Sequence, residues 1–168
     1  MAAIDETKQF IPLNIAVLTV SDTRALADDK SGQTLADRLT EAGHHLAARE
    51  IVTDDVEAIR AMVKKWIADA GVDVVITTGG TGISPTDATP EITRAVLDYE
   101  VPGLADAIRA AGAPTVPTAV LSRGLTGVAG RTLVVNLPGS TGGVRDGLAV
   151  LAGVLDHAVD QLRGGDHR

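Results

Sequence analysis

The segment TTGGTGISPTDATPE, residues 77–91, has the residue types of an anion-binding loop. It follows an apolar run and combines glycines with hydroxyl side chains and a carboxylate. Glycines adopt positive φ and let the backbone approach a ligand closely, so that successive N–H groups can form a concavity for an anion. The alternative is a tight structural turn between a strand and a helix. The glycines are Gly79, Gly80 and Gly82, and the hydroxyl donors are Thr77, Thr78, Thr81 and Ser84.

A second glycine-rich segment, PGSTGG, spans residues 138–143 and precedes a helical pattern. Ser140 and Thr141 can cap that helix, and the free N–H groups of its first turn attract phosphate. An ordinary strand–turn–helix connection is the alternative. Neither segment matches the Walker A pattern or the dinucleotide fingerprint G-x-G-x-x-G. The candidate binding residues here are Pro138, Gly139 and Ser140.

Four aspartates, Asp22, Asp54, Asp55 and Asp87, fall in the loops that follow predicted strands. A carboxylate beside a phosphate cradle suits a bridging cation, and Mg²⁺ prefers carboxylate oxygens together with substrate phosphates. Two structural alternatives remain. Asp54 with Glu57 has the spacing of a helix capping box, and Asp87 can form an Asx turn.

Buried strands alternating with amphipathic helices predict an α/β fold. Nearly continuous apolar runs predict strands at 13–20, 45–52, 72–78, 118–123 and 131–137. Helical spacing predicts helices at 31–43, 54–71, 104–111 and 144–162, and a further helix with Thr89 as N-cap and Pro90 in its first turn. The expected architecture is a three-layer α/β/α sandwich with a mostly parallel central sheet.

We expect one domain over residues 13–163, a leader over residues 1–12 and a frayed tail over residues 164–168. In such folds, ligands bind where loops leave the carboxyl ends of the strands. Both glycine-rich segments lie at that edge. Ser21 and Asp22, after the first strand, belong to the same predicted surface.

Composition excludes several classes of function. The chain of 168 residues carries a net charge of −7 and 2% aromatic residues, which disfavours nucleic-acid binding. It has no cysteine, so thiolate chemistry and disulfides are excluded. We see no signal peptide and no apolar stretch near the length of about 20 residues that spans a bilayer. We therefore expect a cytoplasmic protein.

Several motifs resemble, in order, those of the MoaB/MogA family of molybdenum cofactor biosynthesis proteins, whose relatives include the gephyrin G domain. The resemblance extends from about residue 12 to residue 162. The combination of TTGGTG, D-x-T-P-E and PGS is specific to this superfamily, and the segment QFIPLNIAVLTVSD and the pair GHH look closer to MoaB. The motifs are VSD, DKSG, GHH, ITTGGTG, D-x-T-P-E, LSR and NLPGS.

The resemblance implies a molybdopterin adenylyltransferase that uses Mg²⁺ and ATP to place AMP on the terminal phosphate of molybdopterin. By motif, Asp54 and Asp87 match the acidic positions linked to Mg²⁺ and catalysis. The glycine loops would hold phosphate or pterin, with Ser21 and Asp22 at the pocket wall. The resemblance also implies a homotrimer or a dimer of trimers, and a molybdate-insertion partner protein.

Two features leave alternatives open. Thr86 stands where many active relatives carry arginine, and some MoaB members that lack the acidic pair are inactive. This sequence retains Asp54 and Asp87, which favours an enzyme. The alternatives are a non-catalytic molybdopterin-binding paralogue, acting as a carrier or assembly partner, and another nucleotide-processing activity on the same fold.

Overall fold

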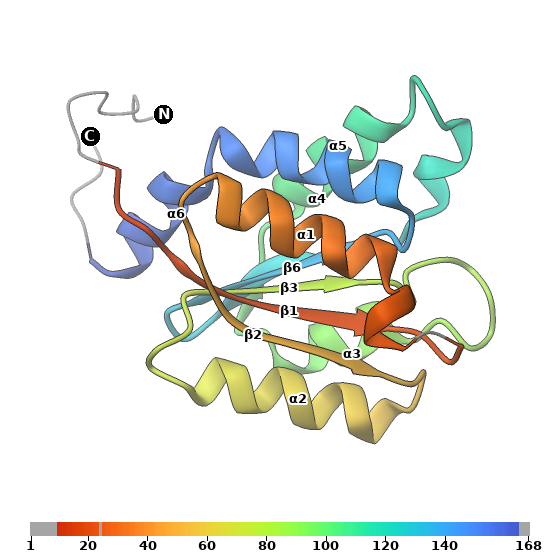
Figure 1. The fold of residues 1–168 in the computed structure, drawn as a ribbon, viewed down its shortest axis with the longest axis horizontal. Helices are drawn as coiled ribbons and strands as arrows, with labels where there is room; N and C mark the ends of the chain where they lie inside the picture. Colours follow the sequence, from red (N-terminus) through yellow and green to blue (C-terminus); the bar gives the residue numbers. More distant parts are fainter. Residues whose placement is uncertain (1–9, 24, 165–168) are drawn as a thin grey trace.

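A central six-stranded sheet lies between two layers of helices in the computed structural model, which describes residues 10–23 and 25–164 (Figure 1). The strand order is β2-β1-β3-β6-β5-β4. Strands β2, β1, β3 and β6 are parallel, whereas β5 is antiparallel to both of its neighbours. The predicted three-layer α/β/α fold with a mostly parallel sheet is confirmed. The strands are β1 (Asn14–Val20), β2 (His45–Val52), β3 (Val74–Thr78), β4 (Tyr99–Glu100), β5 (Thr126–Ala129) and β6 (Thr132–Leu137).

The helices cover both faces of the sheet (Figure 1). One face carries α1 (Lys30–Glu41), α4 (Pro102–Gly112), α5 (Thr141–Ala152) and α6 (Leu155–Leu162). The other face carries α2 (Val56–Ala68) and α3 (Thr89–Val96). Two short 3-10 helices, η1 (Leu26–Asp28) and η2 (Pro117–Leu121), lie in the connections.

The sheet separates two hydrophobic cores, and β1 contributes side chains to both because successive side chains of a strand point to opposite faces. Ile15 and Val17 pack into the core under α1, α4, α5 and α6. Ala16 and Leu18 pack into the core under α2, which contains Trp66. This explains the continuous apolar sequence of β1, which is buried on both faces. Strand β2 lies at the sheet edge and is more exposed, in keeping with its weaker apolar pattern.

The predicted strand at residues 118–123 is wrong. Residues 117–121 form η2, and the strand that pairs with β6 comes later, as β5. A short apolar run does not distinguish a strand from a helical turn, and Pro117 supplies no backbone N–H for a sheet ladder. Gly127 lets β4 and β5 approach, because a Cβ there would lie 2.6 Å from the carbonyl oxygen of Tyr99.

Three helix details also differ from the prediction. The helix expected over 144–162 is divided into α5 and α6 at Gly153 and Val154. Helix α3 has Ala88 at its N-cap, so that Thr89 is the first helical residue rather than the cap. Helix α2 is capped by Asp55, whose carboxylate accepts a hydrogen bond of 3.1 Å from the N–H of Ala58. The capping-box interpretation of Asp54 is therefore wrong.

Residues 1–9 of the predicted leader and 165–168 of the predicted tail lie outside the described residues. No helix in the described part of the chain has the length and apolar character needed to cross a membrane.

Candidate functional site

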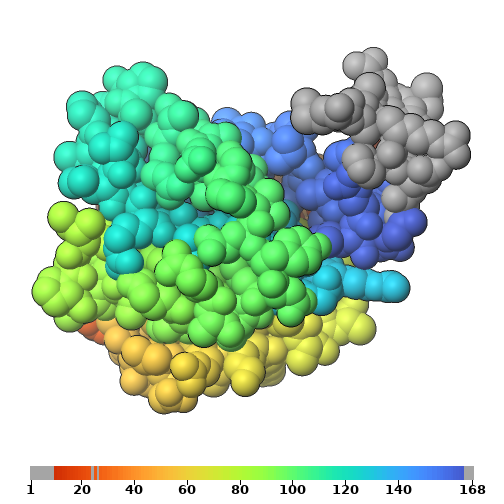
Figure 2. All heavy atoms as spheres, turned by 180° about the vertical axis from the view of Figure 1, so that it is seen from behind, coloured from red at the N-terminus to blue at the C-terminus, as the bar shows by residue number. Residues whose placement is uncertain are grey.

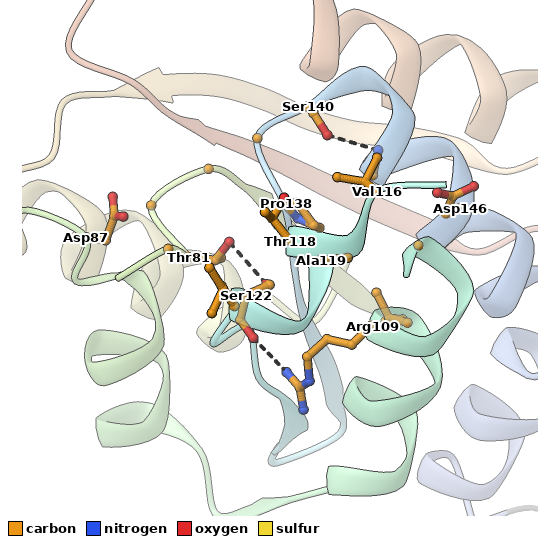
Figure 3. Close-up of a pocket in the computed structure, with 18 of the residues that line it drawn as sticks. Thr81, Asp87, Arg109, Val116, Thr118, Ala119, Ser122, Pro138, Ser140 and Asp146 are labelled. Carbon is orange, nitrogen blue, oxygen red and sulfur yellow. Dashed lines mark hydrogen bonds between the residues drawn. The ribbon is translucent and has the colours of Figure 1, made fainter. Parts of the chain in front are cut away.

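The two glycine-rich loops meet at the carboxyl end of the parallel strands and line one cavity of about 410 Å³ (Figure 3). This volume lies in the range of about 300–1,000 Å³ that is typical of small-molecule sites. The sequence identified the loop after β3 and the loop after β6, whereas the third wall, formed by α4 and η2, was not predicted. The predicted residues that line the cavity are Gly79, Gly80, Thr81, Gly82, Asp87, Pro138, Gly139 and Ser140.

The loop after β3 requires glycine at two successive positions. Gly79 and Gly80 have φ values of 99° and 69°, which side-chained residues rarely adopt. A Cβ at Gly79 would overlap the carbonyl oxygen of Val20, and a Cβ at Gly80 would overlap the hydroxyl of Thr89. That hydroxyl is buried and has no hydrogen-bond partner among the described residues. The loop therefore lies directly on β1 and on the start of α3.

The same loop presents unused donors to the cavity. Within the described residues, the N–H groups of Gly80, Thr81 and Gly82 donate to no acceptor. All three residues line the cavity. Successive free N–H groups in such a turn bind anions. The predicted anion-binding loop thus has unpaired N–H groups on residues that line the cavity.

The loop after β6 adds the N-terminus of α5. Ser140 is the N-cap, and its hydroxyl oxygen accepts a hydrogen bond of 3.0 Å from the N–H of Gly143. The N–H groups of Thr141 and Gly142 belong to the first helical turn and have no intrahelical partner, which favours a bound phosphate. Gly139 lies close to the other loop, because a Cβ there would be 3.4 Å from the Cα of Gly79.

Thr78 joins the two loops rather than facing the cavity. Its side chain is fully buried, and its hydroxyl donates a hydrogen bond of 2.7 Å to the carbonyl oxygen of Pro138. Thr78 was predicted as a binding residue, and it does not line the cavity. The contact instead gives it a positioning role at the point where the two loops cross.

Asp87 lies on the cavity wall against Gly82. A Cβ at Gly82 would be only 2.7 Å from Oδ2 of Asp87, so the glycine leaves room for the carboxylate. The same oxygen accepts a long hydrogen bond of 3.3 Å from the N–H of Ser84, while the N–H of Asp87 donates to the carbonyl of Ser84. The carboxylate accepts from Ser84, three residues before it, so it does not form the Asx turn that the sequence suggested, and its other oxygen has no partner among the described residues.

Arg123 holds this loop from outside the cavity and was not predicted as a site residue. Its guanidinium donates hydrogen bonds of 2.8 Å to the carbonyl oxygens of Gly82 and Asp87, and it forms an ion pair with Glu91. Its own N–H donates to the carbonyl of Thr81 at 2.7 Å. The only signal in the sequence was the LSR motif of the family resemblance.

Asp54 and Asp22 lie next to each other but do not line the cavity. The N–H of Asp54 donates a hydrogen bond of 2.8 Å to Oδ1 of Asp22. Burial raises the pKa of the Asp54 carboxyl above its ordinary value, and a side-chain hydrogen bond with Asp22 and the charges of Asp22 and Asp87 raise it further. The fold thus brings Asp54 within electrostatic reach of Asp87, although 33 positions separate them in the sequence.

Ser21 remains outside the cavity as well. Its N–H donates to the carbonyl oxygen of Val52, and its hydroxyl oxygen accepts a long hydrogen bond of 3.4 Å from the N–H of Thr23. These contacts fix the loop that carries Asp22. The predicted pocket wall of Ser21 and Asp22 therefore lies beside the cavity, near Asp54.

The carboxylates are suited to a cation that the substrate helps to bind. No group of three or more potential ligand side chains is arranged for a metal ion among the residues that the structure describes. Mg²⁺, however, is commonly held by one or two carboxylates together with substrate phosphates. Burial is the main cause of the raised pKa of Asp54, and the charges of Asp22 and Asp87 add to it, so a cation would neutralise negative charge gathered here. The donor set therefore fits Mg²⁺ bound together with a phosphorylated substrate.

The third wall of the cavity is largely apolar. It is formed by α4 and η2, and Figure 2 shows residues 110–122 beside residues 80–88 on one face of the molecule. Arg109 is the only cationic side chain among the lining residues, and its guanidinium donates to the carbonyls of Ser122 and Gly124 and pairs with Asp106. An anion in this cavity would therefore be bound mainly by backbone N–H groups.

Comparisons with known proteins identify the family of this chain. A family model described as "Probable molybdopterin binding domain" matches residues 16–157. Molybdenum cofactor biosynthesis protein B of Escherichia coli K12 is 45% identical over 134 residues, covering 79% of each chain. The solved Mog protein of Mycobacterium ulcerans is 52% identical with a TM-score of 0.83, covering 92% of this chain and 99% of its own.

A crystal structure of a molybdenum cofactor biosynthesis protein B superposes with a TM-score of 0.88 at 38% identity, and covers 93% of this chain and 99% of its own. The family model spans both glycine-rich loops and the helices α4 and η2 beside the cavity. The chain therefore belongs to the MoaB/MogA family of molybdenum cofactor biosynthesis proteins.

Proposed function

We propose that this protein adenylylates molybdopterin, with ATP as the adenylyl donor. The observation that supports this function best is the close approach of two glycine loops at one cavity beside Asp87, where the residues of the loop after β3 have unused N–H groups. Two phosphorylated substrates need two such cradles. The loop after β3 and the N-terminus of α5 supply one each.

In the proposed reaction, an oxygen of the terminal phosphate of molybdopterin attacks the α-phosphorus of ATP. A new P–O bond forms, the bond from the α-phosphorus to the bridging oxygen breaks, and pyrophosphate leaves with that oxygen. The nucleophile is already anionic, so no protein nucleophile is needed. Catalysis then consists of positioning and charge stabilisation. Free N–H groups of Gly80, Thr81 and Gly82 stabilise the phosphate oxygens.

Asp54 and Asp87 would hold Mg²⁺, which supplies positive charge for the phosphate oxygens. Arg109 and Arg123 are engaged by carbonyl and carboxylate groups, so neither guanidinium is available to the phosphates in this arrangement. Thr86, where many relatives carry arginine, lies in an exposed turn with its hydroxyl 3.3 Å from that of Ser84. These contacts make a bound cation more important for this chain.

The test is incubation of the purified protein with molybdopterin, ATP and Mg²⁺, scored for adenylylated molybdopterin. We expect product with the natural protein, and turnover lower by roughly 10²–10⁴-fold in both Asp87→Asn and Asp54→Asn. Asp37→Asn is the matched control, because Asp37 is exposed on α1 and does not line the cavity. Normal turnover in Asp87→Asn and Asp54→Asn would contradict the metal assignment.

A non-catalytic molybdopterin-binding paralogue is the second candidate, since Asp54 does not line the cavity in this structure. Bound molybdopterin without product would support it. Hydrolysis of ATP without molybdopterin would instead favour another nucleotide-processing activity. The homotrimer or dimer of trimers implied by the resemblance is also a proposal, which light scattering during gel filtration tests.

A further inference from the structure

The cavity has two chemically different parts. The glycine loops form a polar part with unused N–H groups. Opposite them, α4 and η2 contribute a wall of aliphatic side chains. A phosphorylated heterocycle has two matching parts: an anionic phosphate, which suits the polar part of the cavity, and a flat, mostly apolar ring, which suits the aliphatic wall. The aliphatic residues of this wall are Ile108, Val116, Ala119 and Leu121, and Ile83 adds an aliphatic side chain from the loop after β3.

Asp146 brings a carboxylate to this apolar wall. It lies in the second turn of α5 and lines the cavity on the side opposite Asp87 (Figure 3). At Gly112, an added Cβ would lie 3.2 Å from the Cβ of Ala119 and 3.7 Å from Oδ2 of Asp146. The carboxylate oxygen and the aliphatic wall thus approach each other across a glycine.

No interaction among the described residues gives the Asp146 carboxylate a role in stabilising the fold. It forms no hydrogen bond or ion pair with any described residue. Other half-buried or buried carboxylates of this protein have partners, such as Asp29 with Arg49 and Asp73 with Arg163. A partly buried, unpaired carboxylate loses hydration without compensation, so its place in a ligand cavity points to a donor on the ligand.

A carboxylate in this position recognises two adjacent N–H donors, because its two oxygens can accept parallel hydrogen bonds. The 2-amino group and N3–H of a 2-amino-4-oxopyrimidine ring form such a pair. Adenine offers an amino group beside an acceptor nitrogen and does not match. The ring of a pterin therefore fits this wall better than the base of ATP.

We propose that Asp146 is a specificity-determining residue that binds the 2-amino and N3–H groups of the pterin ring. This inference rests on the proposed function, since it assigns one end of the same cavity to molybdopterin. The pterin ring then packs on the aliphatic wall, and its phosphate points toward the glycine loops. Binding of ribose hydroxyls by the same carboxylate is the competing assignment.

The test compares two ligands that differ at position 2 of the ring. The probes are 6-hydroxymethylpterin monophosphate and the corresponding lumazine monophosphate, in which a carbonyl replaces the 2-amino group. The natural protein should bind the pterin roughly 10- to 100-fold more tightly, because the lumazine carbonyl faces the carboxylate without a donor. Affinities are measured by calorimetry with the natural protein, Asp146→Asn and the control Asp37→Asn.

Asp146→Asn should invert the preference, because an amide offers one acceptor and one donor, which match the N3–H and the 2-carbonyl of lumazine. A gain of lumazine binding cannot result from loss of folding. Asp37→Asn should behave as the natural protein does. Equal pterin affinity in the natural protein and Asp146→Asn would overturn the inference, while product formation in the adenylylation assay would leave the proposed function in place.

Two further outcomes would overturn the assignment of Asp146 to the pterin ring. An increased KM for ATP with unchanged pterin affinity in Asp146→Asn would assign the carboxylate to the ribose and overturn the inference. Failure of the natural protein to bind either probe, together with absence of adenylylated product, would overturn both the inference and the proposed function.

Discussion

The guanidinium of Arg123 donates a hydrogen bond of 2.8 Å to the backbone carbonyl of Asp87. The same guanidinium donates to the carbonyl of Gly82 and pairs with the carboxylate of Glu91. Arg123 therefore contacts the chain both before and after Asp87. Glu91 lies in the first turn of α3, where a carboxylate is also favoured by the helix dipole. The position of Asp87 therefore depends on a residue 36 positions away.

Replacing Arg123 with lysine should reduce kcat/KM for adenylylation by about 10- to 100-fold. Lysine keeps the positive charge but cannot reach three separate acceptors with a planar fork. Steady-state kinetics with varied Mg²⁺ should show that more Mg²⁺ is needed for half-maximal rate. Arg94→Lys is the control, because Arg94 lies in the last turn of α3, away from the loop, and pairs with Glu100 at the surface. Equal losses in the two variants would contradict a positioning role.

Asp54→Asn should stabilise the protein in the absence of substrate. The pKa of Asp54 is raised by burial and by its acidic neighbours, so the folded state binds its proton more tightly than the unfolded state does. Its ionised form therefore costs stability, and that cost increases as the pH rises through the folded-state pKa. We expect the Tm to increase by about 1–3 °C at pH 7, with no increase at a pH below the ordinary value. Thermal unfolding at both pH values checks this.

A decrease of the Tm at neutral pH in Asp54→Asn would show that the carboxylate stabilises the fold. In that case burial and the charges of Asp22 and Asp87 would not make the ionised carboxylate unfavourable in the folded state. The same variant is expected to lose turnover. A rise in stability with a loss of activity is characteristic of residues retained for function.

Gly79→Ala should destabilise the protein by at least about 2 kcal/mol. Its φ of 99° is unfavourable for a side-chained residue, and the new Cβ would overlap the carbonyl of Val20. Gly103→Ala is the matched control, since Gly103 lies in α4 and a Cβ there meets nothing within 4 Å. The control should be neutral or stabilising by about 0.5–1 kcal/mol. Urea unfolding of both variants measures the difference, and equal values would contradict the strained-loop description.

Stability should decrease as the pH falls below about 6.5 because of His44. Burial lowers the pKa of His44, partly offset by Asp156, and its Nδ1 accepts a hydrogen bond of 3.0 Å from the N–H of Leu13. The unfolded chain therefore binds the proton at a higher pH than the folded chain. Stability from the neutral form is complete above pH 6.5 and is lost as the pH falls through the folded-state pKa.

The check is the slope of the unfolding free energy between pH 5 and pH 7, measured in the natural protein and in His44→Gln. Glutamine does not titrate, so the slope should become smaller even though packing against Phe10, whose ring lies 5.2 Å from that of His44, is lost. An unchanged slope would assign the pH dependence to other groups.

Local pattern was enough to predict the elements that carry the glycine loops. The apolar run of β3 and the glycines that follow it are adjacent in the chain, so the strand and its loop are specified by neighbouring residues. The same holds for β6, Ser140 and the start of α5, where one capping side chain and the following turn define the anion-binding end. These predictions needed no knowledge of distant contacts.

Only the tertiary structure decided what faces these loops. The short apolar run in segment 118–123 suits either a strand or a helical turn, and its residues up to Leu121 fold as part of η2, which forms the wall of the cavity with α4. Arg123, Asp146 and the approach of Asp54 to Asp87 depend on contacts between residues far apart in the sequence. Hydrophobic periodicity reports which face of an element is buried. It does not report which side chains of other elements meet at a sheet edge, because the packing of helices on the sheet determines that.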